Sequence, residues 1–137
     1  MEQKLFTNKV VLNADIDKVK NVLNNPVNLI RWVPEISDVT NTADGFAITR
    51  TEKAINKNEV ISVVNKDNEI EYQSVGDKIK YRILFSLGNE NEQCVIKEKV
   101  YVSEELGIKL PFKLLKPIVK HAFKINLQHL AMFIEKN

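Results

Sequence analysis

The 137-residue sequence lacks several features that define common classes of protein. Its single cysteine, Cys94, cannot form an internal disulfide and fits a reducing compartment. Residues 1–4 include an acid and no apolar run, so the sequence predicts no secretory signal. No apolar stretch further along is long enough to span a membrane. We therefore expect a cytoplasmic protein without a transmembrane segment.

An excess of charge of one sign is also absent. The sequence has 20 Lys and Arg against 18 Asp and Glu, which gives a formal net charge of +2. Arginine is scarce, whereas a nucleic-acid-binding surface needs clustered Lys and Arg with side chains aimed at bases. We therefore expect no nucleic-acid partner. With 44% hydrophobic and 28% charged residues, the chain has the balance of an ordinary globular protein, and its length predicts one domain, residues 1–137.

Hydrophobic periodicity predicts the order strand, two short helices, six strands and one long helix. Residues 4–12 alternate as a first strand, and Asp15 is a suitable N-cap for a helix that ends before Pro26. A second short helix covers residues 27–33 and stops at Pro34. Turn signals then separate six strands whose short connections favour antiparallel pairing. These strands are expected at residues 35–41, 46–54, 59–65, 70–75, 79–87 and 92–102.

Residues 111–135 are predicted to form a single long helix that is apolar over more than half of its circumference. Pro117 falls near its start, which predicts either a helix that begins near Leu115 or a kink at the proline. Because burial of a large apolar side chain contributes roughly 1.5 to 3 kcal/mol, we expect the sheet to receive most of this cylinder. Two polar residues, Asn126 and His129, lie within the apolar arc. The main apolar face comprises Leu115, Val119, Ala122, Phe123, Leu130 and Phe133.

This element order, together with residues 15–23, 25–36 and 114–134, resembles the helix-grip superfamily often called SRPBCC. That superfamily includes the birch pollen allergen, the START lipid-transfer domains and the polyketide cyclase/dehydrase-like proteins. The resemblance covers essentially the whole chain and implies an α+β fold with an apolar cavity. In that fold a seven-stranded curled antiparallel sheet surrounds the long C-terminal helix, and two short helices lie between strands 1 and 2. The superfamily contains binding proteins, cyclases, dehydratases and chaperone activators, and no branch-specific catalytic motif is recognisable here.

Several polar residues occupy positions where the alternation or the helical period points to the interior. A buried polar group without a partner costs about 1 to 3 kcal/mol, so these groups must find partners. They either satisfy one another, or are turned outward by bulges at Arg50 and Glu98, or line a cavity and orient the polar end of a ligand. With Trp32 near the expected cavity mouth and two apolar positions, the candidate ligand-binding residues are Trp32, Arg50, Tyr72, Tyr81, Phe85, Glu98, Ala122, Asn126 and His129.

Other residues that could carry chemistry have simpler interpretations. His121 and His129 are eight residues apart and do not form the four-residue pair of helical metal sites, so we expect no metal and no cofactor. Cys94 lies at an inward strand position, where a lone thiol usually behaves as a small hydrophobic side chain. A strip of lysines on the long helix is either a solvated face or a surface for anionic lipids or an acidic protein. It comprises Lys113, Lys116, Lys120 and Lys124.

The favoured hypothesis is binding or transport of a small hydrophobic or amphipathic molecule, a lipid, polyketide or similar compound, by a monomer or weak homodimer. The alternative is an enzyme of the polyketide cyclase or dehydratase type, with Glu98 or His129 as general base and a tyrosine hydroxyl as acid. A further alternative is a protein-interaction module of the chaperone-activator kind, which requires an exposed apolar patch.

Overall fold

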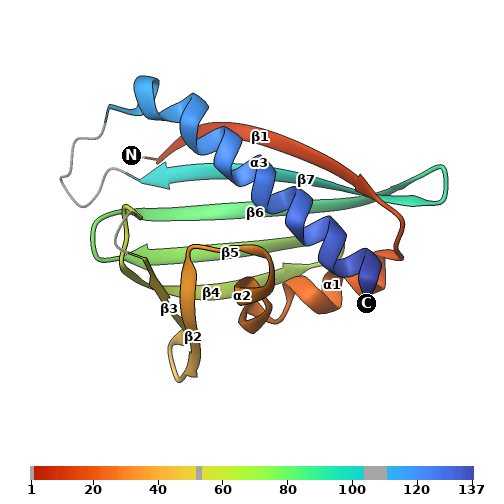
Figure 1. Ribbon diagram of the computed structural model, residues 1–137, viewed down its shortest axis with the longest axis horizontal. Coiled ribbons are helices and arrows are strands. Elements are labelled where there is room, and N and C mark those ends of the chain that lie inside the picture. Colours follow the sequence, from red (N-terminus) through yellow and green to blue (C-terminus); the bar gives the residue numbers. More distant parts are fainter. Residues whose placement is uncertain (1, 52–53, 104–110) are drawn as a thin grey trace.

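The computed structural model describes residues 2–51, 54–103 and 111–137 (Figure 1). Its strands form one seven-stranded antiparallel sheet in the order β1-β7-β6-β5-β4-β3-β2. The elements are β1 (Glu2–Leu12), α1 (Ile16–Leu23), the 3₁₀ helix η1 (Pro26–Asn28), α2 (Leu29–Trp32), β2 (Ile36–Thr42), β3 (Gly45–Arg50), β4 (Asn58–Lys66), β5 (Glu69–Gly76), β6 (Lys80–Glu90), β7 (Gln93–Ser103) and α3 (Phe112–Lys136).

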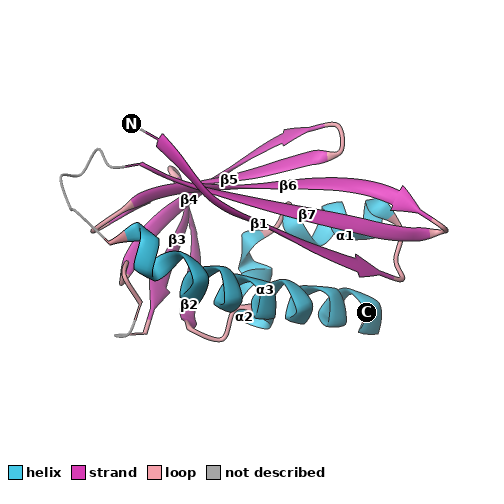
Figure 2. Ribbon diagram, turned by 90° about the horizontal axis from the view of Figure 1, so that it is seen from above, coloured by secondary structure: helices cyan, strands magenta, loops and turns pink. Residues whose placement is uncertain are grey.

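The predicted fold class is confirmed: the sheet is seven-stranded, two short helical segments separate its first two strands in sequence, and α3 crosses one face (Figures 1 and 2). The second short helix is divided into η1 and α2, and Pro26 begins the 3₁₀ part. The third predicted strand, residues 46–54, ends earlier than expected, at Arg50. Residues 52 and 53, at its predicted end, lie outside the described residues.

Tight turns give the sheet its short connections. At the β2–β3 turn, Gly45 has a φ of 136° and a Cβ there would lie 2.6 Å from the Ile61 carbonyl oxygen, so glycine is required on both counts. A register shift between Lys4 and Phe6 marks a bulge in β1 where it pairs with β7. Figure 2 shows α3 lying along the sheet, with α1 and α2 on the same side of it.

The two halves of α3 differ in burial. In its last turns Leu127, Leu130 and Ile134 have no exposed surface and belong to the main core. In its first turns Leu114 is 74% and Ile118 is 67% exposed. The expectation that the sheet receives most of the helix is therefore wrong for the first half. Leu114 and Ile118 are therefore largely in contact with solvent.

The proline in α3 does not delay the start of the helix. The helix is continuous from Phe112, and the backbone N–H groups of Leu114 and Leu115 both donate to the Pro111 carbonyl at 3.0 Å. Pro117 lies inside it, so the prediction of a start near Leu115 is wrong. In this position the ring deprives only one carbonyl of its helical N–H partner, which an exposed first turn tolerates because water can take that place.

Leu130→Ala is expected to lower the free energy of unfolding by about 2 to 5 kcal/mol, because Leu130 is fully buried and its removal leaves a cavity. Leu114→Ala, the same change at an exposed site of the same helix, should alter that free energy by less than about 0.5 kcal/mol. Urea unfolding followed by circular dichroism measures both values. Equal losses would show that the first half of α3 is packed as tightly as the second.

Candidate ligand-binding site

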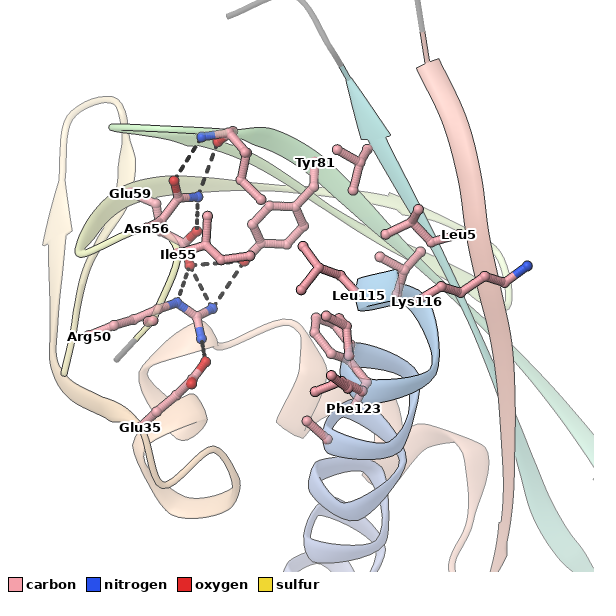
Figure 3. A pocket seen from close by; sticks show the side chains of 17 residues that line it. Leu5, Glu35, Arg50, Ile55, Asn56, Glu59, Tyr81, Leu115, Lys116 and Phe123 are labelled. Carbon is pink, nitrogen blue, oxygen red and sulfur yellow. Dashed lines mark hydrogen bonds and ion pairs between the residues drawn. The ribbon is translucent and has the colours of Figure 1, made fainter. Parts of the chain in front are cut away.

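The larger cavity has a volume of about 280 Å³ and lies between the first half of α3 and the sheet (Figure 3). Strands β1, β6 and β7 contribute one wall, and residues 54–56, between β3 and β4, contribute another. The cavity is partly open to solvent. Its lining is mainly apolar and includes Leu5, Val100, Val102, Leu115, Val119 and Ala122.

Arg50, Glu59 and Tyr81 form the polar part of the cavity wall (Figure 3). Arg50 Nε and Nη2 donate to Glu59 Oε1 at 2.9 and 2.7 Å, and the Tyr81 hydroxyl donates to the same oxygen at 2.9 Å. Arg50 Nη2 also donates to the Tyr81 hydroxyl oxygen at 3.0 Å, and Nη1 donates to Glu35. Burial acts to lower the pKa of Arg50, but its interactions with Tyr81 and Glu59 outweigh this and raise the pKa, so Arg50 stays charged.

The second carboxylate oxygen of Glu59 is also fully engaged. Its Oε2 accepts from Ser74 Oγ at 2.8 Å and from Asn56 Nδ2 at 3.3 Å. Asn56 Oδ1 in turn accepts two backbone N–H groups from the β5–β6 turn. A Cβ on Gly76 would lie 2.1 Å from Asn56 Nδ2, so the glycine makes room for this amide. The five donors to Glu59 all come from the protein, and this part of the wall is satisfied without a ligand.

A smaller cavity of about 30 Å³ lies next to the larger one and contains the other polar candidates. Its lining includes Trp32, Tyr72, Glu98 and Asn126. Glu98 is 1% exposed, and its Oε1 accepts a hydrogen bond from Asn8 Nδ2 at 3.3 Å. Burial raises the pKa of Glu98 to about 8, against the opposing effect of the Asn8 hydrogen bond. At neutral pH the Glu98 carboxyl is therefore mainly uncharged.

Aromatic side chains support the smaller cavity from the core. The Tyr72 hydroxyl donates to the Leu23 carbonyl oxygen of α1, and burial raises the pKa of this phenol. The Phe85 ring packs edge-on against the rings of Tyr72 and Trp32, with centroids 5.2 and 6.4 Å away. Phe85 thus belongs to the core behind the cavity wall.

The structure brings seven of the nine candidate residues to the two cavities. Ala122 borders the larger cavity, Arg50 and Tyr81 border both, and the smaller one takes Trp32, Tyr72, Glu98 and Asn126. Phe85 and His129 border neither cavity. The outward turn considered for Arg50 and Glu98 does not occur. The Arg50 side chain is only 12% exposed, and Glu98 as a whole residue is 1% exposed.

Sequence reasoning missed Glu59 and Asn8, although a signal for each was present. Glu59 shares the alternation of the buried Ile61 in β4, and Asn8 that of the buried Phe6 in β1. A charged residue at a strand end is normally exposed, and this expectation concealed Glu59. Asn56 lies in a connection between strands, where no periodic signal exists.

Within residues 2–51, 54–103 and 111–137, no group of three or more His, Cys, Asp or Glu side chains is placed to hold a metal ion. His121 and Cys94 contribute to neither cavity, and burial raises the pKa of the Cys94 thiol. No helix among these described residues is long and apolar enough to cross a membrane.

No protein-family model matches the sequence, and no curated protein matches it either. Solved structures with the same fold include a START superfamily protein from Mycobacterium smegmatis, with a TM-score of 0.79 and 14% identity over 96% of this chain and 97% of that one. The di-domain ARO/CYC StfQ from the steffimycin biosynthetic pathway has a TM-score of 0.71 and 12% identity over 96% of this chain and 50% of its own. Ara h 8.0201 has a TM-score of 0.69 and 13% identity over 100% of both chains.

These similarities identify the fold of the chain. The chain has the helix-grip fold of the START and SRPBCC proteins, so the resemblance indicated by the sequence is confirmed at the level of fold. At 12 to 14% identity the likeness extends to the fold alone.

Glu59→Ala is expected to lower the free energy of unfolding by about 3 kcal/mol or more, because it leaves Arg50 and Ser74 without their buried acceptor. Glu90→Ala is the matched control, since Glu90 is 61% exposed and its contact with Lys9 measures 4.0 Å. Glu90→Ala should change the free energy of unfolding by less than about 0.5 kcal/mol. Chemical denaturation measures both, and a small loss for Glu59→Ala would contradict the role given to this carboxylate.

Glu98→Gln is expected to remove a pH dependence of stability. The folded pKa of Glu98 is raised to about 8 from an ordinary value of 4.5, so between these values the folded state holds a proton that the unfolded chain has lost. The resulting stabilisation is complete below the unfolded pKa and falls as the pH rises to about 8, by at most about 1.4 kcal/mol per pH unit.

The unfolding free energy of the wild type relative to Glu98→Gln should therefore decrease between about pH 5 and about pH 8 and then level off. Denaturant titrations of both proteins across this range provide the measurement. A difference that stays constant with pH would mean that Glu98 is ionised in the folded protein.

Proposed function

We propose that this protein binds a small, mainly apolar molecule in the larger cavity. The observation that carries the proposal is a space of about 280 Å³ that is lined mainly by apolar side chains and partly open to solvent. An apolar molecule that leaves water for this lining gains roughly 25 cal/mol for each Å² of its buried apolar surface. We include in the proposal that residues 1–137 act as one domain in the cytoplasm, as a monomer or weak homodimer.

The position of the cavity supports a binding role. Leu115, Val119 and Ala122 contribute one wall from α3, and the exposed Ile118 also borders the space. Ile118 and Leu114 are exposed and do not pack in the core. At an entrance to the cavity, such apolar side chains would lower the cost of moving an apolar ligand from water to the interior. The similar START superfamily structure agrees with a ligand-binding role.

The enzyme alternative has weaker support, although one of the similar structures is an ARO/CYC protein. The Tyr81 and Tyr72 hydroxyls donate to Glu59 and to the Leu23 carbonyl, and burial raises the pKa of both phenols, which makes them poor acids. Glu98 is mainly protonated near neutral pH and faces a space of about 30 Å³, which is too small for a substrate. These groups are therefore poorly placed for proton transfer in the larger cavity.

A protein-interaction role is favoured by one observation, the apolar side chains exposed on α3. These are Leu114, Ile118, Ile125 and Met132. A larger side chain in the cavity lining distinguishes the two roles. It should weaken binding inside the cavity, but it should not affect binding to the outer surface of α3.

The fluorescent probe ANS is expected to bind the native protein at one saturable site and to raise its melting temperature, as any ligand selective for the folded state must. Ala122→Phe places a ring in the larger cavity and should weaken ANS binding by about tenfold. Met132→Phe adds a ring to an exposed site of the same helix and should leave the affinity unchanged. Fluorescence titration and thermal unfolding provide the measurements.

Weakening by both substitutions, or by neither, would contradict binding in the cavity. Loss after Met132→Phe alone would favour the protein-interaction alternative, because it would place the probe on the outer surface of α3.

A further inference from the structure

The smaller cavity differs from the larger one in having polar groups that the protein leaves unpaired. Asn8 does not line the cavity but binds Glu98, which does; Asn8 is 3% exposed, and its Oδ1 is a buried acceptor without a hydrogen-bond partner. Its Nδ2 is used twice, for Glu98 Oε1 at 3.3 Å and for the Lys120 carbonyl at 3.1 Å. Neither the second Glu98 oxygen nor the amide of Asn126 is hydrogen-bonded to any described residue. The free oxygen of Glu98 and the amide of Asn126 are therefore available to a ligand in this cavity.

The two cavities are neighbours that share part of their walls. Glu35, Arg50, Tyr81 and Phe123 line both. Phe123 projects from α3 towards Tyr81 in Figure 3, and its ring packs edge-on against Phe6 at 5.4 Å between centroids. The half-buried Phe123 ring therefore lies in the wall that the two cavities share.

We propose that the smaller cavity is the subsite for a hydroxyl group at the end of the apolar ligand, with Glu98 and Asn126 as its hydrogen-bond partners. This inference rests on the proposed binding function and names the ligand class: an alcohol whose apolar body occupies the larger cavity. The volume of about 30 Å³ exceeds the roughly 10 to 15 Å³ that a single water molecule needs, so the subsite has room for a small polar group.

The chemistry of the subsite favours a hydroxyl over other terminal groups. The neutral Glu98 carboxyl and the Asn126 amide both donate, and the Asn126 carbonyl oxygen needs a donor. A hydroxyl both accepts and donates, whereas a ketone or ether oxygen only accepts.

Charged ends are disfavoured. A carboxylate finds no free cation here, because Arg50 already binds Glu59 and Glu35. An ammonium group forces Glu98 to ionise where burial opposes its charge.

The experiment uses octanol and bromooctane, which share an alkyl chain and differ at its end. Their affinities are measured by displacement of ANS near pH 6, where Glu98 is protonated in the folded protein. The wild type should bind octanol about tenfold more tightly than bromooctane, which is the ratio expected for one or two good hydrogen bonds. Asn126→Leu should reduce this ratio to near one while the bromooctane affinity holds or rises.

Gln128→Leu is the matched control, because it also replaces a side-chain amide with leucine, but at an exposed position of α3. It should preserve the octanol preference. Glu98→Leu is the second variant, and it should also abolish the preference while thermal unfolding shows that the protein is still folded.

The outcomes separate this subsite from the proposed function. If Ala122→Phe weakens ANS binding but Asn126→Leu leaves the octanol preference intact, the cavity binds ligands and the hydroxyl subsite is wrong. If octylammonium or octanoate binds more tightly than octanol, the subsite takes a charged group and the inference also fails. If no probe binds the wild type, the proposed function fails together with it.

Discussion

The packing of the last turns of α3 against the sheet holds the rest of the structure in place. Leu127, Leu130 and Ile134 are fully buried, and their contacts fix the direction of the helix across the sheet. Because α3 is one continuous helix, its first half extends in the same direction whether or not it contacts the sheet. The space left beneath the first half is the larger cavity. Tight packing at one end of the helix thus makes it possible to keep a hollow at the other.

The wall of the larger cavity contains the buried ion pair of Arg50 and Glu59. A buried carboxylate is stable only when its lone pairs are occupied, and Glu59 accepts from Arg50, Tyr81, Ser74 and Asn56. These donors come from β3, β5, β6 and the connection between β3 and β4. The hydrogen bonds therefore connect β4 to three other strands and a loop. They hold this part of the sheet together without apolar side chains filling the space beneath α3. A polar network of this kind keeps the wall rigid where an apolar core would fill the cavity.

Most of the fold could be predicted from the sequence, because period-two alternation and turn residues act locally. Strand β7 was expected at residues 92–102 and spans Gln93–Ser103, and α3 was expected at 111–135 and spans Phe112–Lys136. Burial of α3 could not be predicted in the same way. A wide apolar arc has the same pattern whether it faces a packed sheet, a cavity or solvent, and only the position of the other strands distinguishes Leu114 from Leu130.

The candidate site was predictable to the same extent. Inward phase placed Arg50, Tyr81 and Glu98 in the interior correctly, but it did not pair Arg50 and Tyr81 with Glu59, the second residue of β4. Pairing depends on register between strands that are distant in sequence, such as the Ser74–Tyr81 and Ile61–Ser74 pairs that bring β4, β5 and β6 together. Period alone does not contain this information.

The two cavities differ in what each could contribute to the proposed ligand binding. The larger one has apolar surface, and its Glu59, Arg50 and Tyr81 are already paired, so in the proposed function it would supply affinity for an apolar body and discriminate poorly between ligand ends. The smaller one has little volume, but Glu98 and Asn126 in its lining keep polar atoms that no described residue binds. An unpaired buried group strengthens discrimination, because a ligand that fails to pair with it gains nothing from displacing whatever water the space can hold. In the proposed function, selectivity would therefore come from the cavity that contributes least to the buried area.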